Sequence, residues 1–238
     1  MQAEGIATHR HALPATVMDR TRTPYAPFDG TMGLVPAVIL AAGQSLRMGR
    51  VKALLPWPPH GRPCVIHVIE QLRDGGASAV AVVTGAHHDA IAAVVGDRAT
   101  VVFNASHDAG QLGSLQAGLS WAFAGSAEWA IVTLVDVPGV APTTIEMLLQ
   151  AAASTTALIV RPTIGAEHGH PVLWHRNAWP LLRDAGDGGA RQVVRGLAAR
   201  GQVLDVPVDD DSVLRDIDTP AQYQAQVESQ KSKVRSQK

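Results

Sequence analysis

The stretch LAAGQSLRMGRVKALLP, residues 40–56, decides how this sequence folds. It continues a short apolar run, AVIL, that has the composition of a buried strand. Two glycines, Gly43 and Gly49, then enclose Arg47, and Lys52 follows. After the first strand of a parallel sheet, small residues let backbone N–H groups approach a phosphate whose charge basic side chains neutralise. The spacing fits neither G-x-x-x-x-G-K-[ST] nor G-x-G-x-x-G, so a surface loop with solvated charges is the alternative.

Short apolar runs alternate with helical patterns along the rest of the chain. Such runs are typical of strands buried on both faces of a parallel sheet, with helices as the crossovers. The predicted strands are Ala37–Leu40, Ala79–Thr84, Thr100–Asn104, Ala130–Val135, Ala157–Val160, GHPVLW (169–174) and Val203–Val206. The predicted helices are Val65–Arg73, Asp89–Val95, Leu115–Ala124, Thr143–Ala152, Gln192–Ala199 and a last one from Pro220. We therefore predict an α/β fold with one doubly wound, mostly parallel sheet, and a Thr143–Glu146 capping box at the fourth helix.

The pattern predicts one domain over residues 34–225. Residues 1–33 show no periodicity and are predicted to be a disordered leader, or coding sequence upstream of a start at Met32. The polar tail, residues 226–238, is also predicted to be disordered.

The composition excludes several classes of function. Hydrophobic residues make up 46% and charged residues 17%, with a net charge of -1, so neither nucleic acid nor a membrane surface is an expected partner. The sequence has no apolar run long enough to span a bilayer and no apolar segment of a secretory signal. The single cysteine, Cys64, lies in an apolar helical pattern and is predicted to be a buried structural thiol. A cytoplasmic protein is expected.

Carboxylates follow the predicted strands at two places. Asp136 comes directly after a buried strand, where it either caps a turn or holds Mg²⁺, which prefers one or two carboxylates together with substrate phosphates. Asp216 and Asp218 flank Ile217, so both face one side of an extended chain. One of them either caps the last helix or is a second metal ligand.

Two later stretches have polar residues among glycines. The spacing of His168 and His170 suggests a metal site, but no cysteine or third histidine accompanies them, so a polar loop facing substrate is favoured. In GDGGAR, residues 186–191, glycines next to Arg191 at a helix start suit an anion.

Together these stretches resemble the molybdenum-cofactor nucleotidyltransferase family, within the nucleotide-diphospho-sugar transferase superfamily, and its cytidylyltransferase branch in particular. The resemblance covers most of residues 36–225. The matching elements, in order, are LAAGQSLRMGRVKALLP (40–56), VVTG (82–85), GQLGSLQAG (110–118), DVPGV (136–140), GHPVLW (169–174), GDGGAR (186–191) and DIDTP (216–220). This chain has D-V-P where the family has D-M-P, and GQLGSL where the family more often has Met after the first glycine.

The resemblance implies a role for each matching residue. Arg47 and Lys52 are the expected catalytic phosphate-binding cations, Asp136 and Asp218 the expected ligands of Mg²⁺, and His170 and Arg191 the expected contacts to the pterin substrate. The expected nucleotide-binding residues are Leu40, Ala41, Ala42, Gly43, Ser45, Gly49, Gly85 and Ser114. Guanylyltransferases of the family usually read LAGG where this chain reads LAAG, so CTP is the expected nucleotide.

The implied reaction is transfer of CMP from CTP to the terminal phosphate of molybdopterin cofactor, with release of pyrophosphate. The product would pass to a molybdenum oxidoreductase. The acceptor phosphate is already ionised near neutral pH, so the enzyme needs alignment and charge neutralisation rather than a general base. The alternatives are a guanylyltransferase, a sugar- or polyol-phosphate nucleotidyltransferase, and a non-catalytic cofactor carrier or chaperone. A redox activity has no nicotinamide or flavin fingerprint to support it.

Overall fold

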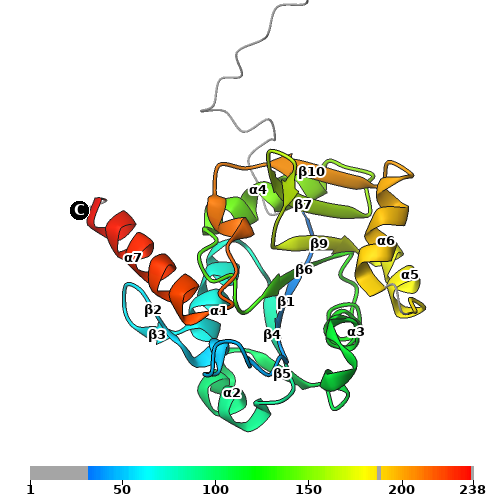
Figure 1. Ribbon diagram of the computed structural model, residues 1–238. Helices are drawn as coiled ribbons and strands as arrows, with labels where there is room; N and C mark the ends of the chain where they lie inside the picture. The colour runs from blue at the N-terminus through cyan, green and yellow to red at the C-terminus, as the bar shows by residue number, and fades with distance from the viewer. Residues whose placement is uncertain (1–31, 187–188, 237–238) are drawn as a thin grey trace, which may run out of the picture.

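The computed structural model describes residues 32–186 and 189–236 (Figure 1). The predicted leader therefore lies outside the described residues except for its last two positions. The strands of the main sheet are β1 (Pro36–Ala41), β4 (Ala79–Thr84), β5 (Thr100–Phe103), β6 (Trp129–Leu134), β7 (Ile159–Ile164), β8 (Glu167–His168), β9 (Val172–His175) and β10 (Val203–Pro207). The helices are α1 (Cys64–Asp74), α2 (His88–Val95), α3 (Gln111–Ala122), α4 (Pro142–Ala153), α5 (Trp179–Arg183), α6 (Gly189–Ala198) and α7 (Pro220–Ser236).

The strands form one mixed, mostly parallel sheet in the order β10-β7-β9-β6-β1-β4-β5, and β8 pairs with β7. The pairs β1–β4, β1–β6, β4–β5 and β7–β10 are parallel, whereas β9 runs antiparallel to both of its neighbours. A separate small hairpin joins β2 (Pro56–Trp57) to β3 (Arg62–Pro63). The predicted doubly wound α/β fold is thus confirmed, and the antiparallel strands β8 and β9 make the sheet mixed.

Helices cover both faces of the sheet because alternate side chains of each strand point to opposite sides. From β1, Ile39 joins a core cluster with residues of α1, α2 and α4. Its neighbour Val38 joins the other cluster, to which α3, α5 and α6 contribute. Figure 1 shows α3, α5 and α6 on one side of the strands and α1 and α4 on the other. None of the helices in the described ranges combines the length and the apolar character that crossing a membrane requires.

The strand order places a binding site at one edge of the sheet. The chain winds from β1 outward to β4 and β5, and then returns to β6 on the other side of β1. The carboxyl ends of β1 and β6 lie level, since Leu40 pairs with Leu134. In open α/β sheets, ligands bind at the carboxyl ends of strands where the winding reverses. The loop after β1 and the turn after β6 therefore flank the expected site.

The start of α4 differs from the predicted capping box. The helix begins at Pro142, and Ala141, its N-cap residue, makes no side-chain cap. Asp210 replaces the cap from a distant loop, because its Oδ2 accepts hydrogen bonds from the Ala141 N–H at 2.9 Å and from the Thr144 hydroxyl at 3.0 Å. The Thr143–Glu146 prediction was wrong because a tertiary contact satisfies the helix terminus instead.

The polar tail also differs from the prediction. Helix α7 extends to Ser236, so residues 226–236 are helical in the structure, and Figure 1 shows this helix projecting from the body. Tyr223 and Val227 are buried in a cluster with Leu55 and Trp57, and this contact anchors the first turns of the helix. The domain bounds of 34–225 remain a prediction.

Candidate functional site

The loop after β1 is an ordered turn. Ser45 has a φ of 55°, and its carbonyl oxygen accepts hydrogen bonds from the N–H groups of Met48 and Gly49, both at 3.1 Å. Gly49 has a φ of 66°, a conformation that glycine adopts without strain. The Ser45 hydroxyl oxygen accepts a hydrogen bond from the Lys52 N–H at 3.2 Å, and Met48 is buried beneath the turn. The loop is therefore fixed at both ends, rather than being a loosely solvated surface segment.

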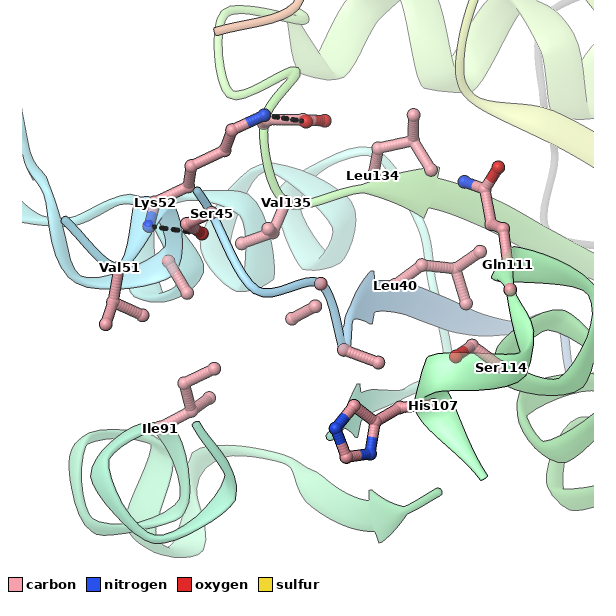
Figure 2. Close-up of a pocket in the computed structure, with 16 residues that line it drawn as sticks. Leu40, Ser45, Val51, Lys52, Ile91, His107, Gln111, Ser114, Leu134 and Val135 are labelled. Carbon is pink, nitrogen blue, oxygen red and sulfur yellow. Dashed lines mark hydrogen bonds and ion pairs between the residues drawn. The ribbon is translucent and has the colours of Figure 1, made fainter. Parts of the chain in front are cut away.

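A cavity of about 340 Å³ opens above this loop. Figure 2 shows Ser45 and Lys52 on one side of it and His107, Gln111 and Ser114 on the other. The residues that line it are Leu40, Ala41, Ala42, Gly43, Ser45, Val51, Lys52, Ala53, Ile91, His107, Gly110, Gln111, Ser114, Leu134, Val135 and Asp136. Six of the predicted nucleotide-binding positions are among them, together with Lys52 and Asp136.

Four charged side chains meet beside the cavity. The Lys52 ammonium nitrogen lies 2.8 Å from Asp136 Oδ2 and 2.6 Å from Asp218 Oδ1. Arg47 contacts the other oxygen of Asp218 at 2.8 Å, but its side chain is 74% exposed while that of Lys52 is only 15% exposed. The two carboxylates predicted for one edge of the sheet thus lie together, with Lys52 between them.

The start of α7 leaves the Asp218 carboxylate available for this contact. Thr219, rather than Asp218, caps the helix: the Gln222 N–H donates to the Thr219 hydroxyl at 3.3 Å, and Gln222 Oε1 accepts from the Thr219 N–H at 2.9 Å. This reciprocal arrangement is a capping box. The Ile217 N–H donates to the Asp136 carbonyl oxygen at 2.8 Å, and this bond holds the two carboxylate-bearing segments side by side.

The ion pairs shift the pKa values of two of these groups. Burial lowers the pKa of Lys52, but the hydrogen bonds that its ammonium group donates to Asp136 and Asp218, together with their charges, outweigh burial and leave the pKa raised. The hydrogen bond from Lys52 and the charge of Arg47 outweigh burial at Asp218 and lower the pKa of that carboxyl group. Lys52 is therefore a cation and Asp218 an anion at neutral pH.

One atom of this cluster is unsatisfied. Asp136 Oδ1 is buried and has no hydrogen-bond partner among the described residues. A buried carboxylate oxygen without a partner is costly, and a bound cation would satisfy it. Asp136 and Asp218 are the oxygen ligands that Mg²⁺ prefers, so the donor set fits a divalent ion. Within the described residues no group of three or more His, Cys, Asp or Glu could hold a metal, so substrate oxygens would complete the coordination.

A second cavity, of about 710 Å³, adjoins the first and shares Leu40, Gln111 and Leu134 with it. Its lining includes the apolar side chains of Leu115, Val172 and Trp174. The polar side chains in the lining include Arg161, His168, His170, Arg191 and Arg195. The two cavities therefore form one cleft that runs along the carboxyl ends of the strands.

His170 and Arg191, the residues expected to contact the pterin substrate, both line the second cavity. Burial is the main cause that lowers the pKa of His170, so its ring is neutral at neutral pH. Its Nδ1 is buried and has no partner within the described residues. Arg191 is exposed near the start of α6, although residues 187 and 188 of the GDGGAR prediction lie outside the described residues. His168 does not join His170 in a metal site, because its ring faces Asp205 at 3.4 Å.

Four predicted residues lie outside the lining of the two cavities, and one of them is Asp218, which contacts Lys52. Arg47 reaches the site only through Asp218, and Gly49 closes the turn below it. Gly85 packs behind the loop, where a Cβ atom would overlap His107 and the carbonyl oxygen of Ala42. Its missing side chain therefore gives the loop room to pack, which is a structural reason for glycine at this position.

Sequence reasoning assigned no role to His107 and left that of Gln111 open, although both line the first cavity. A polar contact across the cavity's rim was also missed: Gln44 Nε2 donates to Asp108 Oδ1 at 2.6 Å and joins the loop after β1 to the segment before α3. Gln111 belongs to the matched GQLGSLQAG element, which was the available signal for it. His107 belongs to no matched element, and only the fold places it at the cavity.

Comparison with known proteins identifies the family to which the chain is similar. Residues 37–203 match the family model described as the MobA-like NTP transferase domain. The chain is 31% identical over 204 residues to nicotine blue oxidoreductase of Paenarthrobacter nicotinovorans, covering 82% of this chain and 97% of that protein. It is 27% identical over 188 residues to a probable molybdenum cofactor guanylyltransferase of Mycobacterium avium, covering 79% of this chain and 92% of the relative.

Solved structures agree in fold. Rv0371c from Mycobacterium tuberculosis superposes with a TM-score of 0.69 at 26% identity, covering 82% of this chain and 99% of the other. A complex of Rv0371c with manganese superposes with a TM-score of 0.66 at 25% identity. The family model spans well over half of the chain, and it includes every residue that lines the two cavities. This chain therefore belongs to the MobA-like NTP transferase family and is an enzyme of the nucleotidyltransferase type.

Proposed function

We propose that this enzyme transfers CMP from CTP to the terminal phosphate of molybdopterin cofactor, releases pyrophosphate and uses Mg²⁺. The observation that carries the proposal is the charge cluster of Lys52, Asp136 and Asp218 beside the first cavity. A partly buried cation next to two carboxylates and a loop rich in backbone N–H groups suits a triphosphate–metal complex. A cytoplasmic location fits this reaction, because its triphosphate substrate is made there.

The second cavity supports the acceptor class. Its apolar lining residues, Trp174 among them, suit a flat heterocyclic ring, and Arg161, Arg191 and Arg195 suit an anionic substituent. Because the two cavities meet at Leu40, Gln111 and Leu134, an acceptor phosphate in one can reach an α-phosphate in the other. Molybdopterin carries both a pterin ring and a terminal phosphate.

In the proposed reaction, an oxygen of the acceptor phosphate attacks the α-phosphorus of CTP. A new P–O bond forms as the bond between the α-phosphorus and the bridging oxygen breaks, and pyrophosphate carries the electron pair away. Backbone N–H groups of residues 42–45 would bind the β- and γ-phosphates, while Lys52 and Arg47 neutralise their charge. Asp136 and Asp218 would hold Mg²⁺, which when bound neutralises triphosphate charge and polarises the α-phosphate.

The nucleotide is tested by supplying each of CTP, GTP, ATP and UTP with molybdopterin and Mg²⁺, and measuring pyrophosphate release and the dinucleotide product. CTP should give the highest kcat/KM. Preference for GTP would replace the proposal by guanylyl transfer, the activity named for the Mycobacterium avium relative. Turnover with a sugar or polyol phosphate, but not with molybdopterin, would show that the acceptor in the proposal is wrong.

Asp136→Asn tests the role of the carboxylate in the reaction, since it keeps the shape of the side chain and removes its charge. It should lower kcat/KM by at least about a hundredfold with little change in thermal stability. Tight molybdopterin binding without any pyrophosphate release would instead support a carrier that delivers the cofactor to a molybdenum oxidoreductase.

A redox activity is the second candidate, because nicotine blue oxidoreductase is 31% identical over most of the chain. The corresponding test is oxidation of NADH or NADPH with a quinonoid heterocyclic dye as acceptor. Dye reduction at rates well above those of pyrophosphate release would favour this candidate over nucleotidyl transfer.

A further inference from the structure

The ammonium group of Lys52 occupies the position between the two carboxylates that would hold a metal ion. Its nitrogen contacts Asp136 Oδ2 at 2.8 Å and Asp218 Oδ1 at 2.6 Å, and Figure 2 shows its side chain directed at the edge of the cavity. Mg²⁺ binds carboxylate oxygens at about 2.0–2.1 Å. A metal ion that bridges these two oxygens would overlap the ammonium group of Lys52. The two therefore cannot occupy this position together.

The charges of the cluster lead to the same conclusion. The carboxylates of Asp136 and Asp218 supply two negative charges, and Lys52 and Arg47 supply two positive charges. Only Lys52 is held close to both carboxylates, and its side chain is mostly buried while that of Arg47 is mostly exposed. Lys52 therefore cancels one of the two negative charges in the less exposed part of the cluster, so a divalent ion that joins it gains less than it would from two unpaired carboxylates.

The side chain of Lys52 can contact a phosphate in the cavity instead of the carboxylates. It projects from a short 3-10 helix, Lys52–Leu54, and lines the same cavity as Ala42, Gly43 and Ser45. A lysine side chain is a flexible four-carbon stem with a compact charge, so it can exchange a carboxylate for a phosphate without backbone movement. Asp136 Oδ1, which has no partner among the described residues, shows that Lys52 satisfies only part of the site.

We propose that Lys52 is an exchangeable counter-ion: it holds Asp136 and Asp218 together until a divalent ion takes its place, and it then moves to the triphosphate. Metal and nucleotide then bind as a coupled pair, since each makes room for the other. This inference rests on the proposed nucleotidyl transfer only for the presence of a triphosphate. It does not depend on which base or acceptor is used.

The test is Mn²⁺ binding to the full chain, measured by electron paramagnetic resonance of the free ion, with Mn²⁺ alone as the probe. Lys52→Met should bind Mn²⁺ at least about tenfold more tightly than the wild type, because the competing cation is gone. Lys52→Arg, which retains the charge, should stay within about threefold of the wild type. Arg50→Met removes an exposed charge from the same loop and should also leave Mn²⁺ affinity within about threefold.

The same variants are then titrated with a non-hydrolysable CTP analogue, and with its GTP counterpart, at saturating Mn²⁺. Lys52→Met should bind the analogue at least about tenfold more weakly, opposite in sign to its effect on the metal. A merely structural Lys52 would weaken both. Should Lys52→Met fail to fold by circular dichroism, Lys52→Gln is used with the same expectations.

Unchanged or weaker Mn²⁺ binding in the folded neutral variants would overturn the inference, even in an enzyme active with CTP. Conversely, tighter Mn²⁺ binding together with weaker analogue binding supports it, even where no pyrophosphate is released with molybdopterin. The experiment therefore distinguishes failure of the counter-ion inference from failure of the proposed nucleotidyl transfer.

Discussion

The side-chain amide of Asn104 donates a 3.0 Å hydrogen bond to the hydroxyl oxygen of Ser114, and both side chains are buried. The orientation of the amide is fixed, because Asn104 Oδ1 accepts a hydrogen bond from the Ser106 N–H at 3.0 Å. The nitrogen must then face Ser114. Since the Ser114 oxygen accepts this bond, its own proton is available to an acceptor in the first cavity, which Ser114 lines.

Asn104→Asp should therefore weaken nucleotide binding. The substitution keeps the acceptor for Ser106 but replaces the donor by a carboxylate, which draws the Ser114 proton away from the cavity. We expect the KM for the preferred triphosphate to rise about tenfold with kcat little changed, the loss of about one hydrogen bond. Ser114→Ala should have a similar effect, and the double variant should be no worse than either one. Steady-state kinetics checks this, with the exposed Asn177→Asp as control; an unchanged KM in Asn104→Asp would contradict it.

Most of the fold could be predicted because each central strand is a run of apolar residues that only burial on both faces explains. Ala79–Thr84 has the predicted bounds, and the other predicted strands differ at their ends by one or a few residues. The antiparallel direction of β9 could not be predicted, because a buried strand has the same composition whichever way it runs. Lys52 could be assigned to phosphate by resemblance. Its position between two carboxylates depends on side-chain contacts made over long separations in the chain.

The cap of α4 is a second feature that depends on a contact over a long separation in the chain and that the sequence therefore could not predict. Residues 141–146 contain a local capping pattern, yet the structure uses Asp210, whose second oxygen also accepts from the Ser212 N–H at 3.1 Å. A helix terminus takes whichever acceptor the tertiary structure brings to it, and that acceptor is invisible to a pattern of nearby residues.

Asp210→Ala should lower the free energy of unfolding by about 1–2 kcal/mol, because it removes the acceptor of the Ala141 N–H and the Thr144 hydroxyl together. Thr143→Ala, at the position that the local pattern would have made the cap, should change it by less than about 0.5 kcal/mol. Urea unfolding followed by circular dichroism compares the two variants. A larger loss in Thr143→Ala than in Asp210→Ala would restore the local capping box.

Two helical glycines should respond in opposite ways to alanine. Gly118 lies where α3 packs on the sheet, and a Cβ atom there would overlap Val38 of β1. Gly118→Ala should cost about 1–3 kcal/mol of stability, because the well-packed core has no room for the added methyl group. A Cβ atom at Gly196 of α6 meets nothing within 4 Å, so Gly196→Ala should stabilise by about 0.5–1 kcal/mol. Thermal unfolding of both variants tests this, and destabilisation by Gly196→Ala would show that its site is not open.

The ion pair of Asp205 at the second cavity predicts a pH dependence of stability. Asp205 Oδ1 accepts a 2.6 Å hydrogen bond from Arg161 Nε, and His168 faces its other oxygen. Burial raises the pKa of Asp205, but the hydrogen bond and charge of Arg161 outweigh burial and bring the pKa below its usual 3.8.

A carboxyl group whose pKa is lowered in the folded state contributes stability that is present above its pKa in the unfolded state. This stability is lost as the pH falls through the pKa of the folded state. The stability difference between wild type and Asp205→Asn should therefore be constant from about pH 5 to 8 and should shrink below about pH 4. It should stay under about 1 kcal/mol, because the Asp205 side chain is 46% exposed and solvent screens the pair. Urea unfolding at a series of pH values measures the difference, and a difference that stays constant down to about pH 3 would contradict the prediction.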